Sequence, residues 1–267
     1  MKKYLALFRI RFINSLQYRA AALAGMATQF AWGFMEILAF LAFYKADPAA
    51  FPMEFSQTVS YIWMQQAFLA LFMVWFFEAE IFNAITSGGI AYELARPVDL
   101  YWRWFSQSVA NRLAKTVLRC LPIFIVAMLV PGPFRMSLPA THGQFLLFLV
   151  SAAFSLGVVV SFSMLIYIST FYTLSSTGVR IISAVLADFL AGAIIPLPFF
   201  PQPFRAIAEM LPFAAMQNMP LRIYSGNITG INAFRGIGLQ VFWLIALILI
   251  GRYMINDALR KVVVQGG

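Results

Sequence analysis

The stretch AALAGMATQFAWGFMEILAFLAFY, residues 21–44, decides the fold of this chain. Glu36 is its only charged residue. An α-helix needs about 20 predominantly apolar residues to cross the hydrocarbon core of a bilayer, and this stretch meets that requirement. The sequence therefore predicts a membrane-spanning helix over residues 21–44.

The composition of the whole chain agrees with this prediction. The 267 residues are 62% hydrophobic and 11% charged, whereas a soluble domain is typically about 25% charged. So few charged side chains cannot coat the surface of a soluble domain of this length. The composition therefore indicates an integral membrane protein.

Further apolar stretches predict five more spans, and the segment 116–130 is short enough that we expect its helix to begin earlier. The expected fold is an all-α integral membrane protein with six transmembrane helices, in a single transmembrane domain over residues 1–267. The five further spans are 59–77, 116–130, 145–170, 179–197 and 234–254.

The distribution of Lys and Arg predicts the orientation of the chain. Of the 19 cations, 14 fall on one set of predicted loops and ends and 5 fall on the other set. Because cytoplasmic loops are enriched in Lys and Arg, both termini and the segment 88–104 are expected in the cytoplasm. The same asymmetry explains the net charge of +9 without a nucleic-acid partner.

The amino-terminal residues 1–20 predict a helix that lies on the membrane surface. Leu5, Phe8, Phe12 and Leu16 recur at spacings of three and four, which is typical of an apolar stripe. Basic amphipathic helices of this kind bind the bilayer interface. A generic positive anchor without further role is the alternative.

Two carboxylates, Glu36 and Asp188, fall inside predicted spans. Charged groups at membrane depth are costly and normally face a bundle interior or water. They are candidates for polar groups of a substrate pathway, or else for interhelical hydrogen bonding. No nucleotide-binding or catalytic motif occurs in the sequence, and a single His142 and a single Cys120 do not suggest a metal site. The chain is therefore not expected to be an enzyme, nor to bind a cofactor or metal itself.

Residues 191–227 hold six of the 13 prolines, including the run PLPFFPQP. Proline breaks helices, so the preceding span should end here, and the apolar segment that follows is too short to cross. We expect an extracellular re-entrant segment over residues 198–227, with an ordinary surface loop as the alternative. Its four phenylalanines are expected to form a hydrophobic plug or an interface that faces the bundle. The candidate gate or re-entrant residues are Pro196, Phe199, Phe200, Phe204, Pro212 and Phe213.

The cytoplasmic segment GGIAYELARPVDLYWRW, residues 88–104, combines glycines, charges and aromatics between apolar stretches. Gly88 and Gly89 permit a tight turn, and Arg96-Pro97 should stop a short helix. Asp99 can then cap a helix that begins near Leu100. Tyr101, Trp102 and Trp104 are expected at headgroup depth.

These two segments resemble those of type-two ABC permeases, the membrane subunits of one group of ABC transporters, and the resemblance covers the whole chain. The family pattern is a glycine, a short helix, Leu and Arg-Pro, with proline-rich re-entrant helices before the last span. The matching residues are Gly89, Glu93, Leu94, Arg96 and Pro97 in the first segment and Pro196, Phe200, Pro201, Pro212, Pro220 and Gly226 in the second.

The resemblance implies a permease of a bacterial cell membrane that works as a heterodimer or homodimer and is driven by a separate ABC ATPase. ATP and magnesium would be bound by that ATPase. Residues 90–95 would form the coupling helix, and the transported solute would be amphipathic or hydrophobic and exported. The residues implied in coupling are Gly88, Gly89, Tyr92, Glu93, Arg96 and Pro97.

Three alternatives stay open. The chain has the size and charge of a substrate-binding membrane subunit of a vitamin-type importer, which also lacks an ATPase motif. An ATP-independent membrane enzyme is another class, although the sequence offers no catalytic cluster. Within the permease interpretation, the segment 88–104 would be a simple polar connector if it does not contact an ATPase.

Overall fold

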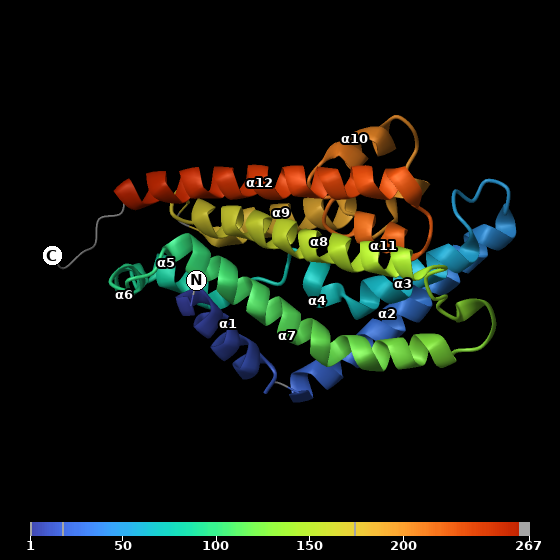
Figure 1. The fold of residues 1–267 in the computed structure, drawn as a ribbon, viewed down its shortest axis with the longest axis horizontal. Helices are drawn as coiled ribbons and strands as arrows, with labels where there is room; N and C mark the ends of the chain where they lie inside the picture. The colour runs from blue at the N-terminus through green and yellow to red at the C-terminus, as the bar shows by residue number, and fades with distance from the viewer. Residues whose placement is uncertain (1, 18, 174, 262–267) are drawn as a thin grey trace.

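The computed structural model describes residues 2–17, 19–173 and 175–261. Within these ranges all regular elements are helices. The long helices run roughly along the longest dimension of the molecule and form an elongated bundle (Figure 1). The prediction of an all-α protein is confirmed.

Among the described residues, three helices have the length and apolar composition needed to cross a membrane. They are α2 (Arg19–Ala46), α8 (His142–Ser169) and α12 (Gly230–Lys261), and they contain the predicted spans 21–44, 145–170 and 234–254, except for Thr170, the residue that follows α8. Helix α8 packs along α12 (Figure 1). Gly157 allows this close approach, because a Cβ atom there would meet the Leu244 side chain at 2.9 Å.

The predicted continuous helix over residues 59–77 is wrong. The chain forms α3 (Phe55–Ala67) and the short α4 (Leu69–Phe72), and residues 73–78 are not helical. The buried Arg112 side chain makes this break tolerable, because it donates to the carbonyl oxygens of Ala70, Met73 and Phe76 at 3.2, 2.7 and 3.0 Å. Irregular backbone at membrane depth requires such partners.

Helix α7 (Leu100–Leu129) contains the predicted span 116–130 up to Leu129, the last helical residue, and begins well before it, as the shortness of that span suggested. Asp99 caps the helix as predicted, since its carboxylate accepts a hydrogen bond from the Trp102 N–H at 3.1 Å. Pro122 lies inside the helix without ending it.

Helix α9 (Ser176–Leu190) ends earlier than the predicted span 179–197. Gly192 follows with φ +77°, a left-handed conformation that favours glycine. The Gly192 carbonyl accepts hydrogen bonds from Tyr61 Oη and Gln217 Nε2 at 3.0 and 3.3 Å. The chain therefore turns away from the helix axis before it reaches Pro196.

The amino-terminal helix α1 (Lys2–Ser15) packs against α7. Its predicted apolar stripe is divided between two environments: Leu5 is 69% exposed, whereas Phe8 and Phe12 are half-buried and stacked at 5.8 Å. Met1 and Tyr18 of the predicted surface helix lie outside the described residues.

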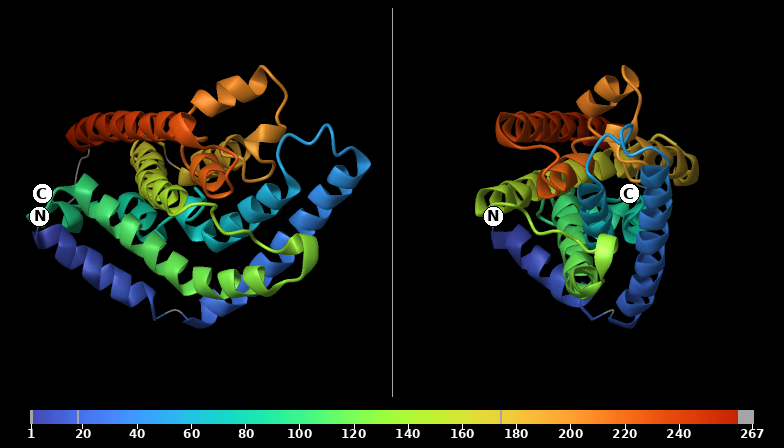
Figure 2. Two further views of the ribbon diagram at one scale, coloured as in Figure 1. Left: turned by 45° about the vertical axis from the view of Figure 1, so that its right-hand side comes forward. Right: turned by 90° about the vertical axis from the view of Figure 1, so that its right-hand side faces the viewer.

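The remaining elements are short. Helices α5 (Ala79–Thr86) and α6 (Ile90–Leu94) lie at the end of the bundle that carries the N-terminus (Figure 1). The other half carries the turn η1 (Gly132–Phe134), the turn η2 (Leu197–Phe199), α10 (Phe204–Met210) and α11 (Asn218–Tyr224). Figure 2 shows α10 projecting from the bundle, while every residue of α11 is buried. Segments predicted on opposite sides of the membrane thus gather in opposite halves of the molecule.

Candidate functional site

The segment 88–104 forms an exposed helical turn at one end of the bundle. Gly88 has φ +76°, a left-handed conformation that favours glycine, and it supplies the turn between α5 and α6. A Cβ atom there would meet nothing within 4 Å. Gly89 has φ −61° and needs no special conformation. The prediction of a tight turn is confirmed, but only one of the two glycines requires it.

Helix α6 presents part of its surface to the outside. Tyr92 is 81% exposed, the largest exposed fraction among the large hydrophobic side chains that the structure describes. Arg96 and Pro97 are exposed beside it. Tyr and Arg are enriched at the centres of protein interfaces, so this surface has the composition of a binding site.

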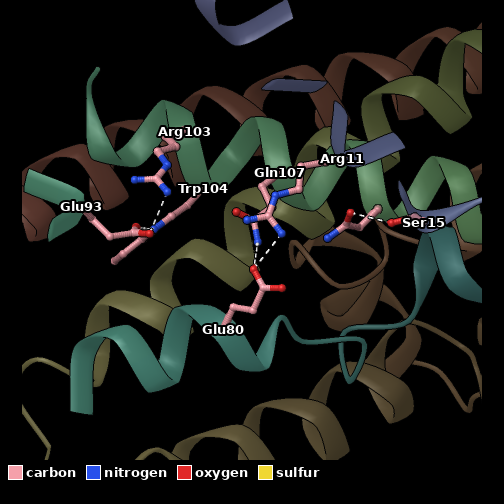
Figure 3. A network of polar contacts seen from close by, with 8 residues as sticks. Arg11, Ser15, Glu80, Glu93, Arg103, Trp104 and Gln107 are labelled. Carbon is pink, nitrogen blue, oxygen red and sulfur yellow. Dashed lines mark hydrogen bonds and ion pairs between the residues drawn. The ribbon is translucent and has the colours of Figure 1, made fainter. Parts of the chain in front are cut away.

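Glu93 points the other way, into the chain (Figure 3). Its two carboxylate oxygens bind Arg103 Nη2 at 2.8 Å and Trp104 Nε1 at 2.7 Å. Both oxygens therefore have partners within this chain. Glu93 fixes α6 to the first turns of α7.

A second polar cluster joins three elements next to α6 (Figure 3). Glu80 of α5 accepts from Arg11 of α1 at 2.7 Å and from Gln107 of α7 at 3.3 Å. Farther along the same helices, Ser15 donates to Asn111 at 2.8 Å. These contacts tie α1 and α5 to the same face of α7.

Asp99, between α6 and α7, is held from several sides. Its backbone N–H donates to Tyr4 Oη at 3.1 Å, and its carboxylate pairs with Arg252 of α12. Lys3 donates to the neighbouring Pro97 carbonyl at 3.0 Å. The exposed turn is therefore connected to α1, α7 and α12.

Two of the three aromatics after Pro97 are not at the molecular surface. Tyr101 and Trp104 are each 1% exposed, and a Cβ atom at Gly251 would meet the Tyr101 ring at 2.8 Å. They fill the packing between α7 and neighbouring helices, so they are not the exposed interfacial aromatics that the sequence suggests. Trp102, at 37% exposed, faces outward.

The predicted phenylalanine plug is divided among three places. Phe199 packs on Phe40 at 4.8 Å between ring centroids, and Phe213 packs on Phe162 at 5.3 Å. Phe200 and Phe204 stack with each other and with Phe189 of α9. Pro196 is buried and Pro212 half-buried. The four rings do not meet in one plug; they pack against the bundle at α2, α8 and α9.

The structure brings Glu36 and Asp188 to one cavity. This cavity, about 610 Å³ in volume, lies among α2, α3, α4 and α9. The two carboxylates come from elements far apart in sequence, so sequence reasoning gave no reason to place them together. Their shared lining supports the interpretation that both belong to a substrate pathway.

Arg112 is the residue whose importance sequence reasoning missed. It is 2% exposed and also donates to Ser163 Oγ at 3.3 Å. In the sequence Arg112 is one of several cations after Pro97. Only the break in the helix over residues 59–77, which Arg112 contacts, would have indicated its structural role.

These features define an integral membrane protein with long apolar helices and a braced, exposed helical turn at one end. A family model described as "ABC-2 family transporter protein" matches residues 30–266. The chain belongs to this family, and its interpretation as an ABC permease is confirmed. A search of curated proteins found no match. The family is the membrane component of its transporters and is not itself catalytic.

Proposed function

We propose that the chain is the membrane subunit of a bacterial ABC exporter and that a separate ATPase drives it through α6. The observation that carries this proposal is the contrast between two adjacent residues: Tyr92 is exposed, whereas Glu93 is locked to Arg103 and Trp104. One face of α6 is free to bind a partner while the other face is fixed to the bundle. A force-transmitting contact needs both properties.

The connections of the exposed turn support this mechanism. A displacement of α6 is passed to α7 by the Glu93–Arg103 pair and to α12 by the Asp99–Arg252 pair. Lys3 and Tyr4 bring α1 into the same unit. ATP and magnesium act in the partner ATPase, whose closure displaces α6; the residues of this chain transmit the movement.

The substrate pathway in this proposal lies along α2, α3 and α9 and is completed by a second permease chain, either a copy or a related subunit. The cavity that contains Glu36 and Asp188 opens among these helices. The chain crosses the membrane six times, with the segment 198–227 as a re-entrant outer element. Both termini lie in the cytoplasm, in agreement with the distribution of cations. The exported solute is amphipathic or hydrophobic.

Copurification of the ATPase tests the proposal. Tyr92→Ala should weaken ATPase binding by about 30-fold, because truncating an interface hot spot costs about 2 kcal/mol. Tyr253→Ala is the matched control, since Tyr253 is 76% exposed on α12. It should leave ATPase binding unchanged. Equal ATPase retention and equal transport by both variants would overturn the assignment of α6.

A further inference from the structure

The cavity among α2, α3, α4 and α9 has a lining that accepts hydrogen bonds and holds two carboxyl groups. Its charged lining residues are Glu36 and Asp188, and no Lys or Arg is among the described residues that line it. Neither carboxylate forms an ion pair with a described residue. This contrasts with the rest of the chain, whose net charge is +9.

The amide side chains of the lining carry no charge, and two of them donate to backbone carbonyl oxygens. Gln29 donates to the Gln66 carbonyl at 2.9 Å, and Gln65 donates to the Ala193 carbonyl at 2.8 Å. Gln29 is only 3% exposed, and its Oε1 atom has no partner among the described residues. Glu36 Oε1 is likewise buried and without a partner among them. The cavity therefore contains two buried acceptor atoms, Gln29 Oε1 and Glu36 Oε1, that could bind a hydrogen-bond donor or a cation.

Aromatic and sulfur-containing side chains complete the lining. Trp32 and Trp75 are 61% and 44% exposed, and Met35 and Met73 lie beside them. The face of a tryptophan ring attracts cations, most strongly organic ones that shed their hydration easily. Methionine adapts to apolar ligands of varied shape. A volume of about 610 Å³ falls in the range that holds a drug-sized molecule.

An anionic solute would meet two carboxylates here, and a small hydrated ion would gain little from the tryptophans. We propose that this cavity binds a lipophilic organic cation of the quaternary ammonium or phosphonium type. That this cation is the transported solute rests on the proposed exporter function; that it binds here does not. The competing explanation is that Glu36 and Asp188 are purely structural interhelical groups.

The test uses two ions of matched shape and opposite charge, tetraphenylphosphonium and tetraphenylborate. The protein is purified in neutral detergent with its bound ATPase, and binding is measured by equilibrium dialysis against protein-free micelles. The wild-type chain should bind the phosphonium at least about tenfold more tightly than the borate. Absence of phosphonium binding, or equal binding of both ions, overturns the proposal.

Substitutions then locate the site. Glu36→Gln with Asp188→Asn keeps side-chain shape and should weaken phosphonium binding about tenfold, while Trp32→Leu should weaken it roughly threefold. Asp47→Asn, an exposed carboxylate after α2, is the matched control and should change nothing. Unchanged binding by the well-inserted double variant also overturns the proposal. If that variant fails to insert, the comparison of the two ions on the wild-type chain decides.

The same preparation separates the two proposals. Dialysis requires no ATP, so the binding result stands by itself whether or not an ATPase is retained. Loss of every copurifying ATPase would count against the exporter function and would leave a demonstrated cation site in place. An intact, ATP-hydrolysing complex without phosphonium affinity would leave the exporter function in place and remove the cation site.

Discussion

Arg222 and Glu209 are joined by an ion pair, Nη1 to Oε1 at 2.5 Å, that ties the projecting α10 to the buried α11. Glu209 also binds Arg205 at 2.9 Å within α10, and Arg222 reaches Asn227 at 2.7 Å. Because Arg222 is only 6% exposed, this pair is the charged anchor of the outer segment.

This anchor should be sensitive to acid. Burial alone would raise the pKa of Glu209, but its hydrogen bonds to Arg205 and Arg222 and their positive charges hold the pKa below its ordinary value of 4.5. A carboxyl whose folded pKa is lowered stabilises the fold above its unfolded pKa, and this contribution is lost as pH falls through the folded pKa. The protection of α10 amides against hydrogen exchange should therefore fall below about pH 4.

Glu209→Gln supplies the control for this prediction. The variant keeps the side-chain shape but cannot ionise, so α10 should be less protected at pH 7 and its protection factor should no longer respond to acid at this site. A wild-type protein whose α10 protection is the same at pH 7 and pH 3 would contradict the role of the pair.

Gly192 should resist substitution. Its φ is +77°, and a Cβ atom added there would lie 3.0 Å from the Tyr61 hydroxyl, so Gly192→Ala adds backbone strain and a close contact. We expect a loss of about 2 kcal/mol in stability, seen as a lower unfolding temperature in detergent. Gly178→Ala is the control, because that glycine lies in the first turn of α9 beside open space and the change should be neutral or slightly stabilising. Equal effects of the two variants would exclude the strain.

The Glu93–Arg103 pair should behave as a unit. Arg103 is 5% exposed, so removing one partner leaves a charge in a poorly solvated place. Glu93→Gln and Arg103→Gln should each lower the stability by about 2 kcal/mol, and together by clearly less than the sum. Substrate-stimulated ATP hydrolysis should fall while Tyr92 still retains the ATPase. Strict additivity in this double-mutant cycle would show that Glu93 and Arg103 do not stabilise the fold as a pair.

The orientation is testable with two exposed positions on a Cys120→Ser background. Tyr92→Cys should react with a membrane-impermeant maleimide only after the cells are opened, because α6 is expected in the cytoplasm. Leu138→Cys, 68% exposed in the opposite half, should react in intact cells. The reverse pattern would invert the topology.

The sequence predicted those features that depend on local chemistry. The Asp99 cap, the short helix that begins at Ile90 and the three helices α2, α8 and α12 follow from capping, turn residues and hydropathy. It failed where a distant partner decides the outcome. The break after Phe72 depends on Arg112, and the burial of Tyr101 depends on Gly251 of the last helix.

Site residues show the same division. The exposure of Tyr92 agrees with its predicted place on a short surface helix, whereas Glu93 turns inward because Arg103 and Trp104 lie on the following helix. Hydropathy locates Glu36 and Asp188 in apolar stretches, but their meeting in one cavity results from the tertiary placement of the end of α9 at a cavity lined by α2 and α3. A pattern within one segment does not contain that information.

The continuity of α7 gives the molecule a lever. The stretch from Leu100 to Pro122 is helical without a break, and at 1.5 Å per residue it is about 33 Å long. If an ATPase displaces α6, as proposed, the contacts of Asp99 with α1 and α12 would pass that displacement to α7 as a tilt. A tilt of about 5° would move the far end of this stretch by about 3 Å, so in the proposed mechanism a small displacement of α6 would change the space between the helices at the other end of α7.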